Sequence, residues 1–296
     1  LTAWIVVAGV QRGIEKYAKI LMPILLLLII ILDIRAVTLA GAQEGLEFLF
    51  KPDFSKLNTN SILEALGQAF FSLSIGMGTL VTYGSYINKK ENLTNTAISV
   101  SAADTIIAIL AGVAIFPAVF AFGIEPNAGP DLIFRTLPNI FQQIPGGYYF
   151  SLLFFILLAV AALTSSISVL EVVVAYFTEE LGILRRPATI VAAVAITALG
   201  VLSTMSWGAL KDVSLFNQNI FDLLDFTASS ILLPVGGLFI VVFVGWYMGK
   251  NLVKDELSSQ GLWRVKLIKV FMLIVKFLAP IAIALVFMHG IGLLKF

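Results

Sequence analysis

The sequence predicts an all-α protein, a polytopic bundle of transmembrane helices. Hydrophobic residues make up 59% of the 296 residues and charged residues only 12%, with a mean hydropathy of +0.99. A soluble domain of this length needs far more charged surface. The apolar residues also come in long runs. In lipid only helices or a closed barrel satisfy every backbone hydrogen bond, and these runs are too long for barrel strands.

Seven apolar segments are long enough to cross a bilayer. A hydrocarbon core of about 30 Å is spanned by about 20 residues of helix. The segments that reach this length are 14–40, 62–87, 95–123, 149–180, 187–206, 223–248 and 267–293. No separate soluble domain is indicated, so residues 1–296 are expected to form a single transmembrane domain.

The basic residues predict how these segments are oriented. If the stretch before 14–40 is cytoplasmic, most Lys and Arg residues fall on the cytoplasmic side, in agreement with the positive-inside rule. They are concentrated at 12–19, 89–90, 185–186 and 250–269. The chain is therefore expected to start on the cytoplasmic side.

Two connections on the opposite side are long, at 41–61 and 124–148. A solvated linker would be polar, but the second connection keeps several apolar residues between its prolines and glycines. It is expected to form short helices that fold back over the outer face as a cap. The apolar residues are Ile133, Phe134, Leu137, Ile140 and Phe141.

Composition also excludes several functions. The chain has no cysteine, one histidine (His289) and a net charge of +1. Thiol chemistry is therefore absent, and a nucleic-acid partner is not expected. A hydrolase needs a base beside its nucleophile, yet no histidine lies near a serine cluster and paired catalytic aspartates are missing, so the protein is not expected to be an enzyme.

The segment 62–87 carries an unusual set of residues for a membrane helix. Gly76 and Gly78 lie near its middle, and a glycine weakens a helix by about 1 kcal/mol relative to alanine. Gln68, Ser72 and Ser74 add polar groups to the same stretch. Close helix packing is one explanation, since small residues are common where membrane helices meet. The polar residues favour another explanation, a helix broken at mid-membrane that binds a ligand.

Two acidic residues lie inside apolar segments. Asp104 is in the first third of 95–123, where a carboxylate usually has a cation or proton partner; it could instead pair with a basic residue or be protonated. Glu171 lies in 149–180 and could be a second site or a packing anchor bonded to a backbone amide. A third acid, Asp225, lies one turn into 223–248 and could reach an outer vestibule.

Three consecutive hydroxyls, Thr164 to Ser166, lie in the middle of the segment 149–180. Such hydroxyls often bond back to carbonyls one turn earlier. They are also hard oxygen ligands of the kind that sodium prefers. Gly13 and Pro23, nine residues apart at the start of 14–40, indicate either a fixed kink or a point where the helix unwinds, because Pro23 removes one helical hydrogen bond.

Four motifs, taken together, resemble the neurotransmitter:sodium symporter family and its LeuT-type fold. The stretch "GQAFFSLSIGMG" looks like the broken sixth helix of that family, "LTSS" like its eighth helix, and "LDFTAS" like the start of its tenth. The stretch "PNAGPDLIFRTLPNIF" resembles the fourth outer loop, which caps the site. The resemblance covers essentially the whole chain and fits the bacterial amino-acid branch best.

This resemblance implies that the chain begins in the tail of family helix four and continues through helices five to eleven. Only the second of the two inverted repeats would then be complete. Helices one to three, which carry parts of both sodium sites, would be missing. The chain by itself is therefore expected to be inactive.

The resemblance also assigns roles to individual residues. The substrate pocket would be lined by Phe71, Ser72, Ser74, Met77, Ser165 and Val169. One sodium ion would bind Ser72 and Asp104, and a second would bind Ala161, Thr164 and Ser165. Gate residues would be Asp225 outside and Tyr86 and Glu179 inside. Helix unwinding would occur at Gly13, Pro23, Gly76 and Gly78.

The resulting expectation is a sodium-coupled symporter for neutral, apolar or aromatic amino acids in the bacterial inner membrane. Because Asp104 supplies a fixed negative charge, chloride should not be required. Its partners would be the amino acid, sodium and the lipid bilayer; the oligomeric state is not predicted. Two alternatives stay open, a non-transporting amino-acid sensor on the same fold and an ion channel, although no filter-like repeat is found.

Overall fold

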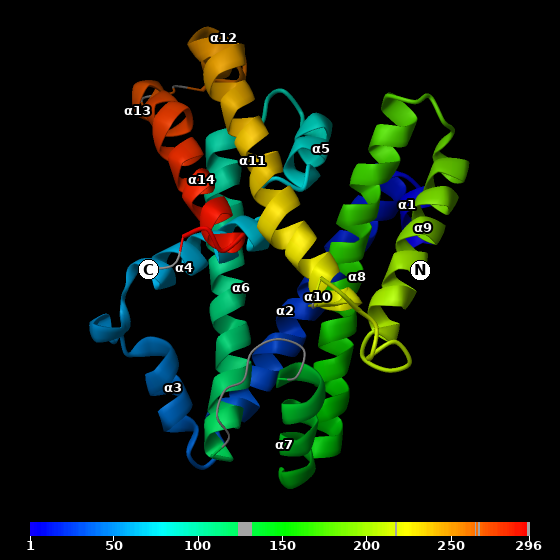
Figure 1. The fold of residues 1–296 in the computed structure, drawn as a ribbon, viewed down its shortest axis with the longest axis vertical. Coiled ribbons are helices and arrows are strands. Elements are labelled where there is room, and N and C mark those ends of the chain that lie inside the picture. The colour runs from blue at the N-terminus through cyan, green and yellow to red at the C-terminus, as the bar shows by residue number, and fades with distance from the viewer. Residues whose placement is uncertain (124–131, 217, 264, 266, 295–296) are drawn as a thin grey trace. The chain divides into compact units, whose positions relative to one another are not determined.

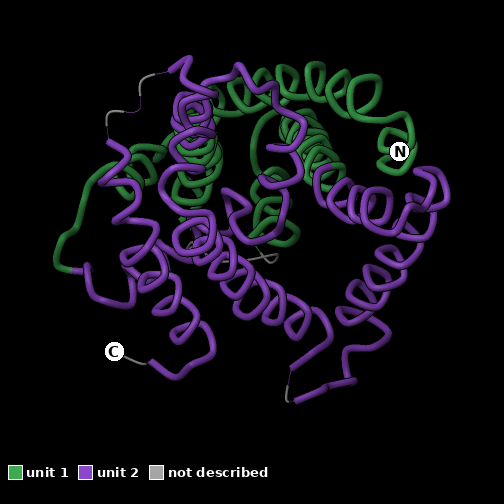
Figure 2. The backbone as a smooth tube through the Cα atoms, turned by 90° about the horizontal axis from the view of Figure 1, so that it is seen from above, with its two compact units in different colours: residues 1–55, 102–167 green, residues 56–101, 168–296 purple. Residues whose placement is uncertain are grey.

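The computed structural model describes residues 1–123, 132–216, 218–263, 265 and 267–294. These residues form two compact units, one made of 1–55 with 102–167 and the other of 56–101 with 168–296 (Figure 2). Two long helices, α6 (Leu93–Ala121) and α8 (Gly147–Glu179), each contribute to both units. The units are therefore interleaved along the chain and are not successive domains.

Helices dominate the described residues, as the composition predicts (Figure 1). Within these residues, six helical runs are long and apolar enough to cross a membrane. They are Val10–Val37, Leu93–Ala121, Gly147–Glu179, Arg185–Met205, Ile220–Leu257 and Ile268–Gly290. Each corresponds to one of the seven predicted segments. The remaining segment, 62–87, is the one whose composition indicates a break.

The first unit contains the beginning of the chain. Its elements are α1 (Thr2–Val7), the π-helix η1 (Val10–Glu15), α2 (Lys16–Val37), α3 (Ala42–Phe50), the 3-10 turn η2 (Phe54–Lys56, which ends in the second unit), most of α6, the π-helix η3 (Leu132–Thr136), α7 (Leu137–Gln143) and the first part of α8.

The expected short helices of the outer connection are confirmed in η3 and α7, and residues 124–131 of that connection lie outside the described residues. Leu137, Ile140 and Phe141 are buried against Leu32 of α2 and against α6 and α8. Apolar residues are kept in this connection because α7 is part of the packed core of the first unit.

Gly13 lies within η1 and is packed against Ile5 of α1. A Cβ atom on Gly13 would come within 2.0 Å of the carbonyl oxygen of Ile5, so only glycine fits this contact. Pro23 lies inside α2, which runs without interruption from Lys16 to Val37. The wide π-helical turn at Val10–Glu15 is the local irregularity in this region, and unwinding at Gly13 and Pro23 stays a prediction.

The second unit contains the broken segment and the C-terminal half of the chain. Its elements are α4 (Thr59–Ser72), α5 (Thr79–Tyr86), the start of α6, the end of α8, α9 (Arg185–Met205), the two-residue strands β1 (Ser214–Leu215) and β2 (Gln218–Asn219), α10 (Ile220–Asp225), η4 (Phe226–Leu232), α11 (Leu233–Val242), η5 (Phe243–Met248), α12 (Gly249–Leu257), α13 (Ile268–Leu273), η6 (Ile274–Leu278) and α14 (Ala279–Gly290).

The predicted break in segment 62–87 is present between α4 and α5. Three residues in it have left-handed backbone angles, with φ of 54° at Ser74, 91° at Gly76 and 79° at Gly78. This conformation costs a non-glycine residue about 1 kcal/mol or more, which explains the two glycines. The regular helical hydrogen bonds stop here and resume when the amide of Thr82 donates to the carbonyl of Gly78, at 2.9 Å.

The break is packed directly on the backbone of α11. A Cβ atom on Gly76 would lie 2.2 Å from the carbonyl oxygen of Leu233 and 2.8 Å from the amide nitrogen of Gly237. Conversely, a Cβ atom on Gly236 would lie 2.4 Å from the carbonyl oxygen of Gly76. Both explanations offered by the sequence therefore apply, because the glycines permit the break and also permit the close packing.

We expect Gly76→Ala to destabilise the protein by roughly 2 to 3 kcal/mol, because the new methyl group combines a left-handed φ with a clash against backbone atoms. Thermal unfolding of the purified protein measures this as a lower midpoint. Gly84→Ala, in α5, is the matched control: no atom lies within 4 Å of the added Cβ, so this change should stabilise the helix slightly. Equal midpoints for the two variants would contradict the tight contact.

Candidate functional site

Four of the residues predicted to line a substrate pocket lie in the break or in the last turn of α4 before it. On the α4 side Phe71 is 48% exposed and Ser72 is exposed, while Ser74 and Met77, within the break, are half-buried. The left-handed conformation of Ser74 turns the backbone at this point, so that the chain leaves the axis of α4. Groups at such a break are exposed to ligand and to other parts of the protein, which is the usual arrangement at transporter sites.

The other predicted pocket residues lie on α8. Ser165 is exposed and belongs to the first unit, whereas Val169 is 47% exposed and belongs to the second. Gly78, at the end of the break, lies close to α8, since a Cβ there would be 3.2 Å from Cγ1 of Val172. The structure thus brings α5 and the second part of α8 together within one unit.

A cavity of about 360 Å³ in the second unit adjoins the first half of the broken helix. Gln68 and Phe71 line it from α4, Asp225 from the end of α10, Ser229 from η4 and His289 from α14. Asp225 is the predicted outer-gate acid and Phe71 a predicted pocket residue. The two residues thus line the same cavity, and their roles stay predictions.

The hydroxyl run on α8 provides oxygen atoms in the first unit. The hydroxyl of Thr164 donates a 2.8 Å hydrogen bond to the carbonyl oxygen of Ala161, and that of Ser166 donates to the carbonyl of Ala162 at 2.6 Å. The back-bonding expected of membrane hydroxyls is therefore confirmed. It also means that the Ala161 and Thr164 oxygens assigned to the second sodium lie next to one another.

The residues assigned to the first sodium belong to different units. Ser72 ends α4 in the second unit, and Asp104 is half-buried on α6 in the first. Both take part in polar or electrostatic interactions within the structure. Among the described residues, no three His, Cys, Asp or Glu side chains are grouped as a metal site.

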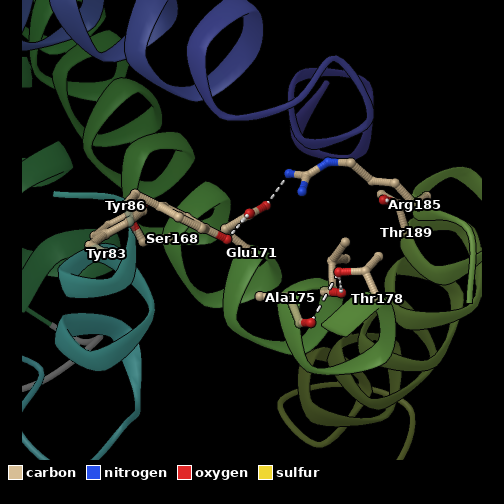
Figure 3. A network of polar contacts seen from close by, with 9 residues as sticks. Tyr83, Tyr86, Ser168, Glu171, Ala175, Thr178, Arg185 and Thr189 are labelled. Carbon is tan, nitrogen blue, oxygen red and sulfur yellow. Dashed lines mark hydrogen bonds and ion pairs between the residues drawn. The ribbon is translucent and has the colours of Figure 1, made fainter. Parts of the chain in front are cut away.

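Both carboxylate oxygens of Glu171, on α8, have a partner (Figure 3). Its side chain is 0% exposed. One carboxylate oxygen accepts a 2.8 Å hydrogen bond from the hydroxyl of Tyr86, and the other forms an ion pair with the guanidinium of Arg185. One turn earlier, Ser168 accepts a 2.8 Å hydrogen bond from the hydroxyl of Tyr83.

This network corrects part of the interpretation from sequence. Glu171 is anchored by a tyrosine hydroxyl and a guanidinium, not by a backbone amide. Tyr86, a predicted inner-gate residue, bonds Glu171, whereas Glu179 is exposed at the end of α8. The sequence did not assign a role to three members of this network, namely Arg185, Tyr83 and Ser168. The one local signal was spacing, because Ser168 and Glu171 are three residues apart and thus on one helix face.

The network ties three elements together, because Tyr86 ends α5, Glu171 lies on α8 and Arg185 begins α9. Burying a carboxylate without a partner costs several kcal/mol, so the cation and the hydroxyl are required for its stability. The fold is that of a helical membrane protein with one broken helix, and its second unit holds a cavity beside α4 and a buried ion pair on α8.

Comparison with known proteins identifies the family. A profile described as the Sodium:neurotransmitter symporter family matches residues 1–295. The uncharacterized sodium-dependent transporter YhdH of Bacillus subtilis is 40% identical over 296 residues, which are 100% of this chain and 66% of that protein. An uncharacterized sodium-dependent transporter of Haemophilus influenzae is 42% identical over 97% of this chain and 62% of its own length.

Among solved structures, the crystal structure of MhsT in complex with L-phenylalanine matches with a TM-score of 0.86 and 48% identity, over 98% of this chain and 65% of that chain. The chain therefore belongs to the sodium:neurotransmitter symporter family and has the LeuT-type fold. It spans slightly less than two thirds of the length of these relatives.

We expect Arg185→Ala to destabilise the protein by about 3 to 5 kcal/mol, because it leaves the Glu171 carboxylate buried without its cation. Thermal unfolding would show this as a lower midpoint, and adding Glu171→Gln should restore part of the loss since the charge is removed. Arg186→Ala is the control, as Arg186 is the exposed neighbour. If both arginine variants unfold at the same temperature, the ion pair does not stabilise the fold.

Proposed function

We propose that this chain is part of a sodium-coupled symporter that carries neutral amino acids with apolar or aromatic side chains across a bacterial inner membrane. The observation that carries the proposal is the break at Leu73–Gly78 with the pocket residues around it. Broken helices at mid-membrane expose backbone dipoles that bind ions and the charged ends of small substrates. Family membership and the names of the relatives support the same function.

The substrate class follows from the side chains of the proposed pocket, which come from the break, from α4 and from α8. Phe71, Met77 and Val169 are apolar, and Ser72, Ser74 and Ser165 add only hydroxyls. A charged substrate side chain would have no partner there, and burying it unpaired costs several kcal/mol. Met77 adapts its shape, which favours large apolar side chains. The match to a structure solved with L-phenylalanine supports this class.

Two sodium ions are proposed as the coupling ions. The second would replace the hydroxyl-to-carbonyl hydrogen bond between Thr164 and Ala161 with two metal–oxygen contacts, and Ser165 would add a third oxygen. The first would bind Ser72 and Asp104. Entry of one charge is worth about 2.3 kcal/mol per 100 mV of membrane potential, so two ions suffice to drive uptake against a gradient.

Gating is proposed at the two ends of the site. Asp225 closes the outer vestibule, and Tyr86 with Glu179 closes the inner side, where Tyr86 is held by Glu171. An amino-acid sensor on the same fold is the second candidate, since binding residues alone do not require transport. The experiment below separates the two, because a sensor binds the amino acid without moving it.

Proteoliposomes that contain the protein from its complete reading frame should accumulate labelled L-phenylalanine when an inward sodium gradient is imposed, and not with potassium. Unlabelled leucine and tryptophan should compete, whereas glutamate and lysine should not. Uptake should persist when chloride is replaced by gluconate, because Asp104 supplies the fixed charge. Asp104→Asn should weaken this uptake and make it respond to chloride.

Three outcomes would contradict parts of the proposal. Binding without sodium-dependent accumulation would favour the sensor. Strong competition by glutamate or lysine would show that the apolar pocket is wrongly assigned. Unchanged sodium affinity in Asp104→Asn, a nearly isosteric variant, would show that Asp104 is a structural, protonated side chain.

Substitutions of the adjacent hydroxyl residues on α8 test the second sodium site. Thr164→Ala combined with Ser165→Ala should raise the sodium concentration for half-maximal uptake at least several-fold, because two ligand oxygens are lost. Ser166→Ala is the matched control: it also bonds back to a carbonyl one turn earlier but is outside the proposed ligand set. If all these variants keep the original sodium dependence at normal protein yield, the hydroxyls only stabilise the helix.

A further inference from the structure

Two adjoining cavities lie at the end of the second unit where α12, α13 and the start of α6 meet (Figure 1). One has a volume of about 560 Å³ and the other of about 730 Å³. Trp263 and Val265 line both cavities, so the two cavities lie next to each other. The roles proposed above for transport use neither cavity.

The smaller cavity is mainly apolar. Leu93 and Ile98 of α6, Leu257 at the end of α12, and Leu267 and Phe271 beside and within α13 line it. Several of these side chains are strongly exposed, with Ile98 at 63% and Leu267 at 68%. In a protein that spans a membrane, such a surface is suited to hydrocarbon chains.

The larger cavity is the more polar of the two, and a lysine side chain lines it. Lys254 and Asn251 from α12 line it together with Ser258 and Gln260 from the following turn, and Asp255 is its one lining carboxylate among the described residues. The surrounding stretches are more basic than acidic. Their described charged residues are Lys89, Lys90, Lys250, Lys254 and Lys269 against Glu91, Asp255 and Glu256.

The turn between α12 and α13 is fixed against the start of α6. The hydroxyl of Ser259 donates to the carbonyl oxygen of Glu91 at 2.5 Å, and the indole of Trp263 donates to the carbonyl oxygen of Lys90 at 3.1 Å. Ser259 and Gln260 accept left-handed φ angles of 50° and 58° in this turn. A non-glycine residue takes this conformation only where the surroundings require it, so the cavities have a defined shape.

We propose that the two cavities form a binding site for one anionic phospholipid of the cytoplasmic leaflet. An acyl chain lies in the apolar cavity along Leu93, Ile98 and Phe271, and the phosphate group lies in the polar cavity at Lys254. Trp263 is placed between them, at the depth where the hydrocarbon ends and the headgroups begin, which tryptophan side chains prefer in membranes. The charge distribution places this end of the chain on the cytoplasmic side.

The lysines explain why the lipid is anionic. Basic pockets between membrane helices on the cytoplasmic side attract acidic headgroups, and each nearby lysine strengthens this attraction. A general excess of lysine follows from the positive-inside rule alone. A mainly apolar cavity that adjoins a second cavity lined by a lysine does not follow from that rule, and it distinguishes a site from a merely basic surface.

The proposal can be tested by quenching tryptophan fluorescence with brominated phospholipids. The protein is reconstituted into phosphatidylcholine vesicles that contain increasing fractions of either brominated phosphatidylglycerol or brominated phosphatidylcholine. The part of the quenching that is absent in Trp263→Phe reports on this site. Brominated phosphatidylglycerol should quench it at a mole fraction at least threefold lower than brominated phosphatidylcholine does.

Lys254→Gln should remove this preference, whereas Lys250→Gln should keep it, because Lys250 is on the same helix but lines neither cavity. Equal loss in the two variants would show a general surface potential and overturn the site. If brominated phosphatidylcholine or brominated phosphatidylethanolamine quenched Trp263 as strongly as brominated phosphatidylglycerol does, the recognition of an anionic lipid would be overturned. Absence of Trp263 quenching by every lipid would show that no acyl chain lies beside Trp263 and would overturn the site.

Discussion

The rest of the candidate site depends on the backbone contact between Gly76 and α11. A helix that stops in the middle of a membrane leaves amide and carbonyl groups without helical partners, and each such group is costly in lipid. Here the break is placed on another backbone, where neither Gly76 nor Gly236 has a side chain to keep the two apart. The break is thereby sheltered by protein and can offer its polar groups to a ligand.

The two halves of the broken helix have different neighbours within the second unit. Side chains of α4 line a cavity together with those of α10, η4 and α14. The end of α5 is instead bonded to α8, through Tyr83 to Ser168 and through Tyr86 to Glu171. Because the break separates the halves, a movement of one does not have to be transmitted rigidly to the other.

Helix α8 combines two kinds of polar chemistry along its length. Its middle carries uncharged oxygens, with Thr164 and Ser166 bonded back to carbonyls of their own helix. About two turns later it carries the fully buried Glu171 with its cation Arg185. The hydroxyls are satisfied within their own helix, whereas the carboxylate has its counter-charge on α9 and therefore links two helices.

The sequence by itself determined the fold class, six of the membrane-crossing helices and the break in the segment 62–87. These features depend on local properties, namely the length of apolar runs and the conformational freedom of Gly76 and Gly78. Such properties can be recognised in a single sequence. The α8 hydroxyls and their bonds to carbonyls one turn earlier are equally local. The resemblance to the family, whose membership the comparisons confirm, added the expected roles of the residues, which stay predictions.

Only the tertiary structure decided the partners of the polar groups. Nothing in the sequence near Glu171 shows that its counter-charge is Arg185, fourteen residues later, or that Tyr86 donates to it from 85 residues earlier. The same holds for Gly236, whose match with Gly76 requires α11 to pack on the break, and for the cavity at Trp263, formed by stretches more than 150 residues apart. Long-range pairs are set by how helices pack, and packing depends on the shape of the whole surface, which no local pattern of residues encodes.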